Sequence, residues 1–121
     1  MTTPFRPCLE DICHDVDGAV LATVMGLDGL PVDTVAGQSD IDVAALVVEY
    51  SSLLQQVRRT AQVLAAGNLE ELTIRSHNLT TIIRLVTDTY FLAVAVKPLG
   101  LTGKARFYLK RQVMALKSEL S

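Results

Sequence analysis

The stretch of sequence that decides the fold is residues 18–33, which read GAVLATVMGLDGLPVD. Its first half is apolar at nearly every position, and this pattern is typical of a strand that is covered on both faces of a sheet. The dipeptide Asp28-Gly29 then lies between two apolar runs, which is the strongest short-range signal of a β-hairpin. We therefore predict a buried strand over residues 19–25, a tight turn, and a second strand over residues 30–35.

A long apolar helix is predicted after the hairpin, from Ser39 or Asp40, either of which fits a capping position, to about Ala66. Its apolar stripe is wider than one contact with a sheet requires, so we expect a second helix to pack there. Shorter amphipathic helices are predicted over residues 9–16 and 103–120. The last helix has a basic side that faces either water or an acidic surface; it is made by Arg106, Lys110 and Lys117.

Three further strands are predicted over residues 69–75, 79–86 and 90–96, because these runs are rich in branched and apolar residues and are separated by turn signals. The last is apolar on both faces, so we expect it to pair with the strand over residues 19–25 in the middle of the sheet. Pro31 fits an edge strand, since proline cannot donate to a ladder. The order helix-strand-strand-helix-strand-strand-strand-helix predicts an α/β fold, a three-layer α-β-α sandwich with a five-stranded, mostly antiparallel sheet. The long helix is expected on one face and the terminal helices on the other.

Composition and charge exclude several classes of protein. The chain has 121 residues, half of them hydrophobic, and we expect a single domain over residues 1–121. No apolar run reaches the roughly 20 residues of a membrane span, and the first residues lack an apolar signal core, so we expect a cytoplasmic protein without membrane insertion. The net charge of −2 hides an asymmetry, because residues 1–50 hold nine acidic residues and one basic residue, whereas residues 51–121 hold four and ten. No basic patch is interleaved with aromatic residues, so no nucleic-acid partner is expected.

No arrangement of residues predicts an enzyme. His14 and His77 have no nucleophile beside them in a recognisable setting. Cys8 and Cys13 lie five residues apart on one helix, which suits neither a mutual disulfide nor a common zinc module, so we expect reduced thiols. The glycines of residues 26–29 precede a strand and lack the lysine of a phosphate-binding loop. We therefore expect no catalytic residue, no cofactor and no metal.

An interface between two copies of the chain is, in contrast, predicted. Pairing two long helices about a two-fold axis would bury their surplus apolar width, and pairing the strand over residues 69–75 with its twin would hide an open sheet edge. The alternative is a helix that is wide only because the sheet beneath it is curved. The residues expected in the dimer interface are Leu46, Tyr50, Leu53, Leu54, Val57, Ala61, Leu72 and Ile74.

From about Leu9 to Leu120 the chain resembles the roadblock/dynein light chain family, whose domains share this order of elements, the opening strand and the Asp-Gly hairpin. In length it is most similar to stand-alone bacterial members of the MglB type, which are homodimeric regulators of small Ras-like GTPases. The resemblance implies a roadblock-like protein that binds such a GTPase and stimulates GTP hydrolysis by rearranging the GTPase's own residues, without an arginine finger. It also implies that the partner contacts the paired long helices, at Tyr50, Leu53, Leu54, Val57 and Arg58.

Two other functions stay open on the sequence. Some roadblock proteins are scaffolds or adaptors that dock motor chains or membrane-associated complexes, for which a dimer with a protein-binding groove suffices. A small-molecule sensor of the profilin-like fold is the third interpretation, although no convergent polar groups for a ligand are evident. The identity of the partner, and a heterodimer with a sister roadblock chain in place of the homodimer, stay open as well.

Overall fold

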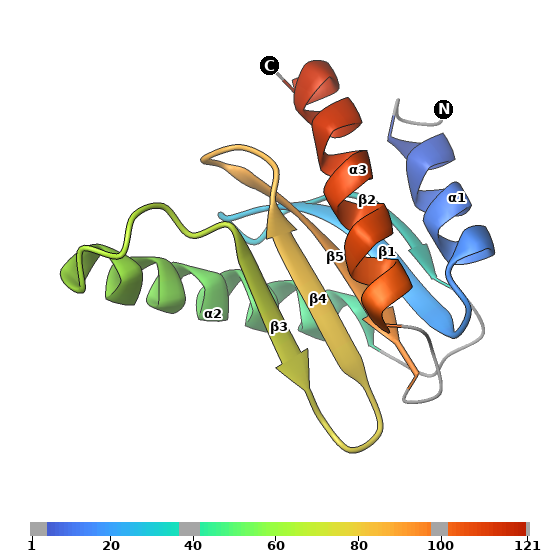
Figure 1. Ribbon diagram of the computed structural model, residues 1–121, viewed down its shortest axis with the longest axis horizontal. Helices are drawn as coiled ribbons and strands as arrows, with labels where there is room; N and C mark the ends of the chain where they lie inside the picture. Colours follow the sequence, from blue (N-terminus) through green and yellow to red (C-terminus); the bar gives the residue numbers. More distant parts are fainter. Residues whose placement is uncertain (1–4, 37–41, 98–101, 121) are drawn as a thin grey trace.

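The computed structural model describes residues 5–36, 42–97 and 102–120, which form helices and strands in the predicted order (Figure 1). The observed ends of the strands lie close to the predicted ones, whereas the long helix is shorter at both ends. The elements are α1 (Arg6–Asp15), β1 (Ala19–Gly26), β2 (Pro31–Ala36), α2 (Val43–Val63), β3 (Glu71–Arg75), β4 (Thr80–Leu85), β5 (Tyr90–Val96) and α3 (Thr102–Leu120).

The five strands form one sheet in the order β2-β1-β5-β4-β3, and each neighbouring pair is antiparallel. The predicted pairing of the two apolar strands is confirmed, because β1 and β5 lie side by side in the centre with Thr23 opposite Ala93. The hairpin is also confirmed. Gly29 has a φ of 89°, which glycine adopts without strain, and the Gly26 N–H donates to Leu30 O at 2.9 Å to close the turn. Pro31 lies on the edge strand β2, as predicted.

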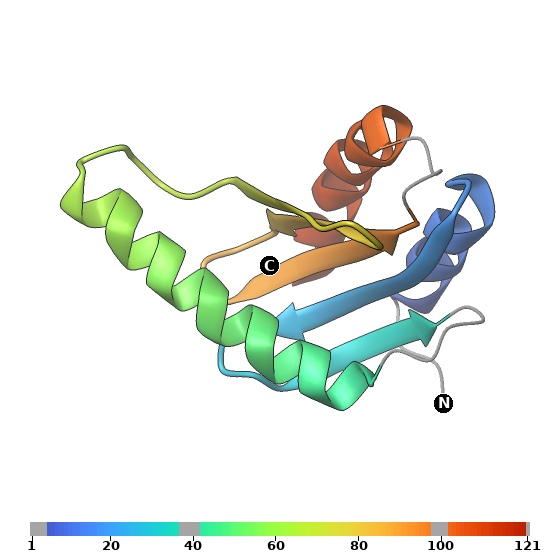
Figure 2. The same cartoon turned by 90° about the horizontal axis from the view of Figure 1, so that it is seen from below.

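The three layers are those expected from the sequence. Helices α1 and α3 cover one face of the sheet, and α2 lies across the opposite face (Figures 1 and 2). Alternate residues of the central strands point to opposite faces, so Val24 and Leu92 contact the α1/α3 layer while Met25 and Phe91 contact α2. The α1/α3 side holds the larger core, whose helical members are Leu9, Ile12, Leu109, Val113 and Leu116.

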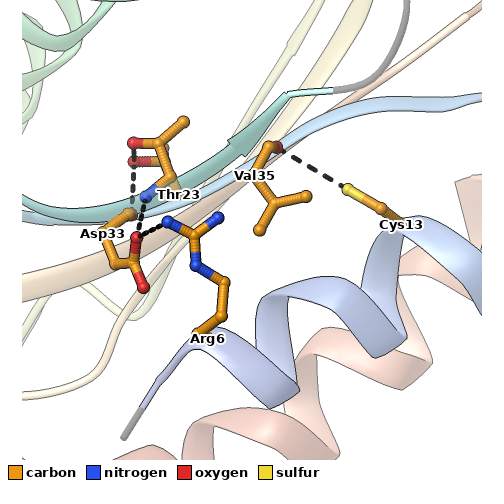
Figure 3. Close-up of polar contacts among 6 residues, drawn as sticks. Arg6, Cys13, Thr23, Asp33 and Val35 are labelled. Atoms are coloured by element: carbon orange, nitrogen blue, oxygen red, sulfur yellow. Dashed lines mark hydrogen bonds and ion pairs between the residues drawn. The ribbon is translucent and has the colours of Figure 1, made fainter. Parts of the chain in front are cut away.

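An ion pair fastens α1 to the edge strand β2 (Figure 3). Arg6 Nη2 lies 2.7 Å from Asp33 Oδ1, and the side chain of Asp33 is only 7% exposed. The same carboxylate oxygen accepts a hydrogen bond from the Thr34 N–H at 2.9 Å, and Thr23 Oγ1 donates to Asp33 O at 3.1 Å. A charge that points inward from an edge strand also opposes pairing of that edge with another chain. The β2 edge is therefore protected within the single chain.

The start of α2 differs from the prediction. Its N-cap is Asp42, whose carboxylate accepts a hydrogen bond from the Ala45 N–H at 3.2 Å, whereas Ser39 and Asp40 lie outside the described residues. A run of several polar residues offers more than one capping group, and the structure uses the one nearest the apolar stripe. None of the helices in the described parts of the chain is long and apolar enough to cross a membrane.

Candidate protein-interaction site

Helix α2 carries more apolar surface than the sheet covers. Among its side chains that the structure describes, only those of Ser51 and Leu54 are buried. Val48 and Val63 are 58% and 84% exposed, and Leu64, the residue after the helix, is 71% exposed. The C-terminal end of α2, which holds Val63, extends beyond β3, where no strand lies beneath it (Figure 1). Exposed apolar side chains grouped along one element are typical of a protein-interaction surface.

Leu54 is a core residue, and the prediction that it contacts a partner is wrong. Its side chain is fully buried in a cluster with Met25, Ile83 and Phe91. A side chain without exposed surface cannot contact a second protein unless the helix leaves the sheet. The spacing of apolar residues locates the stripe of a helix, but it does not tell which residue of a wide stripe faces the sheet.

The other predicted interface residues are half-buried, and their contact with a partner stays a prediction. On α2, Leu46 and Tyr50 pack against the Leu54 cluster. The Tyr50 hydroxyl group is hydrogen-bonded to Thr81 on β4, and burial raises the pKa of Tyr50. Leu53 and Val57 are four residues apart and so share one side of α2. This side, which we name the α2 flank, consists of the half-buried or exposed residues Leu46, Leu53, Val57 and Leu64, while Ala61 is half-buried near the sheet-facing centre.

β3 is the second edge of the sheet, as the sequence predicted, and its apolar residues lie on the same face of the molecule as α2. Leu72 pairs with Ile83 and Ile74 pairs with Thr81 on β4. Since Ile83 belongs to the Leu54 cluster and Thr81 contacts α2, both β3 side chains point toward the α2 side, where they are half-buried. Unpaired backbone groups of an edge strand are a template for another strand. The α2 flank and the β3 edge thus offer one continuous surface for a second chain.

The opposite side of α2 borders a hollow of about 390 Å³ that is open to solvent. Arg58 Nη1 donates to Asp88 O at 2.7 Å, and Nη2 lies 3.6 Å from Asp88 Oδ1 in the turn between β4 and β5. Gln55 donates from its side chain to Leu27 O in the β1–β2 turn. The hollow is lined by Gly26, Leu27, Asp28, Gln55, Arg58, Asp88, Thr89 and Tyr90.

Sequence reasoning missed Gln55 and Asp88 as parts of this hollow. Their contacts join residues 28 and 30 positions apart in the chain, and no local pattern signals such pairs. The orientation of Arg58 follows from these contacts, because the guanidinium is held against the Asp88 turn with the side chain 32% exposed. Arg58 is therefore held beside Asp88 at the surface.

Cys8, Cys13 and His14 all lie on α1. Both cysteines are free thiols, as predicted, and the Cys8 thiol donates to Gln112 Oε1 at 3.1 Å. Burial, with a smaller effect of Asp11, raises the pKa of Cys8 to about 11, which makes it a poor nucleophile at neutral pH. His14 is exposed, and its hydrogen bond to Asp15 raises its pKa. Within the described residues, no three His, Cys, Asp or Glu side chains lie close enough to hold a metal ion.

Comparison with known proteins identifies relatives by structure. No family model and no curated protein matches the sequence. MglC from Myxococcus xanthus is 35% identical, with 97% of this chain and 99% of that chain covered and a TM-score of 0.72. A roadblock/LC7 domain from Streptomyces avermitilis is 15% identical over 93% of each chain, with a TM-score of 0.83. The gliding protein MglB from Thermus thermophilus is 14% identical over 98% of this chain and 91% of that chain, with a TM-score of 0.87.

An antiparallel sheet in the order β2-β1-β5-β4-β3, with one long helix on one face and two helices on the other, is thus the roadblock fold. The likeness to MglC extends over nearly the whole of both chains at 35% identity. The chain belongs to the roadblock/LC7 family, with MglC and MglB among its bacterial relatives, and this confirms the predicted family.

Proposed function

We propose that the chain is a homodimeric regulator that binds a small Ras-like GTPase and stimulates its GTP hydrolysis. The observation that carries the proposal is the α2 flank, whose apolar side chains lie beside the open β3 edge on one face of the molecule. A two-fold axis through this face brings two α2 helices together and joins the two β3 strands into one sheet. The same contact covers the α2 flank and satisfies the edge.

The pairing of two α2 helices creates a composite surface to which both copies contribute an Arg58–Asp88 pair and the adjoining hollow. Membership of the roadblock/LC7 family, with a gliding protein among its structural relatives, supports a GTPase as the partner. The nucleotide site belongs to the GTPase, and this chain acts by contact, without an active site of its own. We assign Arg58 to this contact, together with those parts of Tyr50, Leu53 and Val57 that the pairing of the helices leaves exposed.

Light scattering after size-exclusion chromatography tests the dimer and the partner together. The purified chain is run alone and then mixed with a GTP-loaded small GTPase from the same genome. We expect a species of at least twice the chain mass of 13.1 kDa, which shifts to a larger complex with the GTPase. A phosphate-release assay on the complex then measures GTP hydrolysis. A complex without stimulated hydrolysis makes the chain a scaffold, and a species of single chain mass contradicts the dimer.

Arg58→Ala tests the assigned contact, with the neighbouring Arg59→Ala as its matched control. Arg59 is exposed and makes no ion pair with any residue that the structure describes. We expect Arg58→Ala to weaken GTPase binding about 10-fold, which corresponds to about 1.4 kcal/mol, and Arg59→Ala to change it less than about 2-fold. Calorimetric titration measures both. Equal affinities for the two variants would remove Arg58 from the contact.

A further inference from the structure

The outer surface of the α1/α3 layer carries separated charges of opposite sign. On α3, Lys110, Arg111 and Lys117 are exposed beside two apolar side chains, Phe107 and Met114, which are 63% and 76% exposed. These large apolar side chains face solvent on a helix whose other side is already packed on the sheet. A solvated helix face does not require them, and their position among basic residues is typical of a protein contact.

On α1, the outward residues include the exposed acids Glu10 and Asp11. Neither acid, nor Lys110, Arg111 or Lys117 on α3, forms an ion pair with any other described residue. The basic side of α3 therefore divides in two. Arg106 is used within the chain, since its Nε lies 3.2 Å from Glu71 Oε2 on β3, whereas the two lysines and Arg111 have no ion-pair partner among the described residues.

Two contacts fix how the acidic and basic surfaces lie relative to each other. Tyr108 donates to Asp15 Oδ2 at 2.8 Å, and the Cys8 thiol donates to Gln112 at 3.1 Å. The later α3 residue thus meets the earlier α1 residue, so the helices are antiparallel neighbours, as Figure 1 also shows. Residues 110–112 of α3 consequently lie at the same height along the layer as residues 8–11 of α1.

We propose that this layer binds the same layer of a second copy of the chain, and so forms a self-interface separate from the α2 face. A two-fold axis that runs parallel to the helices, above the layer and midway between them, places α3 of each copy over α1 of the other. Rotation about this axis leaves the position of each residue along the helix direction unchanged. Arg111 of one copy therefore faces Asp11 of the second copy, and Lys110 lies near Glu10 of the second copy. The contact is made twice, and it covers Phe107 and Met114 on both copies.

Charge complementarity selects a second copy over a membrane as the occupant. An anionic bilayer would attract α3, but it would also meet Glu10 and Asp11 on the same surface and be repelled there. A protein partner must place basic residues opposite Glu10 and Asp11, and acidic residues opposite Lys110 and Arg111. A second copy turned by the two-fold axis presents this arrangement without further requirements. Together with an α2 dimer, the second two-fold contact would build a tetramer or a longer chain of dimers.

A charge exchange between two variants tests the proposal. Lys110→Glu/Arg111→Glu places acidic residues at these positions on both α1 and α3. Glu10→Lys/Asp11→Lys places basic residues there on both helices. We expect each variant alone to lose the contact, because like charges then face each other across the axis. An equimolar mixture of the two variants should regain the contact, because the acidic helices of one variant then face the basic helices of the other. Misfolding of a variant cannot produce such recovery, so the mixture serves as the control for both.

Light scattering measures the mass of each sample at about 0.1 M and about 1 M salt, which shortens the screening length from about 10 Å to about 3 Å. We expect the wild-type mass to fall by a factor of two or more at high salt, and the variants alone to show the high-salt mass already at low salt. The high-salt mass reports the α2 dimer separately, so failure of one contact is distinguishable from failure of the other.

Three results would overturn the proposal. They are a wild-type mass that is the same at both salt concentrations, variants that associate like the wild type, and a mixture that fails to regain mass. A parallel sedimentation assay uses vesicles of phosphatidylcholine and phosphatidylserine. Salt-sensitive binding to these vesicles, without self-association, would assign the surface to a membrane and would likewise contradict the second copy.

Discussion

The two faces of the sheet are covered in very different ways. On one face, α1 and α3 together bury Leu9, Ile12 and Leu109 completely, and the Arg6–Asp33 ion pair holds α1 to the edge strand. On the other face, the 21-residue α2 has only two buried residues among its described side chains. Apolar length along a helix is therefore a poor guide to its role. The first face of the sheet is thus covered by tightly packed helices, whereas α2 leaves apolar side chains exposed on the second.

The largest expected effect distinguishes the centre of α2 from its flank. Leu54→Asp places a charge in a fully buried site and should cost more than about 4 kcal/mol of unfolding free energy, a large share of the total for a small protein. Leu53→Asp, one residue earlier on the half-exposed flank, should change the stability of the single chain by about 1 kcal/mol or less and halve the measured mass.

Urea denaturation followed by circular dichroism, together with light scattering, measures both Leu variants. A Leu54→Asp protein that unfolds cooperatively near the wild-type midpoint would show that α2 is not anchored by its centre. A Leu53→Asp protein that keeps the dimer mass would exclude the α2 flank from the interface.

A smaller effect distinguishes the ion pairs of the two faces. Asp33 is 7% exposed and its removal leaves Arg6 without its carboxylate, so Asp33→Ala should cost about 2 kcal/mol. Asp88, the carboxylate paired with Arg58 on the α2 side, is 96% exposed, and Asp88→Ala should stay within about 0.5 kcal/mol of the wild type. Urea midpoints compare the two. Equal costs would mean that the buried pair contributes no more than the solvated one.

The smallest perturbation leaves the fold intact. It uses the reactivity of the Cys8 thiol to measure how tightly α1 packs against α3. A pKa of about 11 in place of 9.0 leaves about 100-fold less thiolate at a given pH below both values. In a Cys13→Ser variant, iodoacetamide should therefore modify the native protein about 100-fold more slowly at pH 8 than the same chain in urea, and the native rate should rise with pH toward 11. Native and unfolded rates that agree at pH 8 would indicate that α1 opens readily from α3.

Much of the fold was predictable because local patterns determine it. The two strands that are apolar on both faces can satisfy that pattern only in the middle of a covered sheet, and β1 and β5 do lie there. The Asp28-Gly29 turn requires a positive φ that glycine supplies, and the hairpin follows. The edge position of β3 was also predictable, and the resemblance to the roadblock family rested on the same order of elements.

The details of the candidate site were not predictable, because they depend on contacts between distant segments. The phase of α2 on the sheet decides that Leu54 is buried and Leu53 is half-exposed, and periodicity alone does not set that phase. The Arg58–Asp88 and Arg6–Asp33 pairs join residues about 30 positions apart, and charge pairing at that separation has no sequence signal. For the same reason, the sequence does not reveal the ion pair between Arg106 and Glu71.

The end of α2 beyond β3 has a consequence for hydrogen exchange. Val63 and Leu64 are largely exposed at the end of the helix, so their side chains contribute little packing that would oppose local opening there. In an isolated chain, the amides of this turn would exchange with solvent deuterium much faster than those around Leu54. A second α2 alongside would slow exchange at the end of the helix and leave its centre unchanged. The exchange gradient along one helix would thus report how much of the chain is paired.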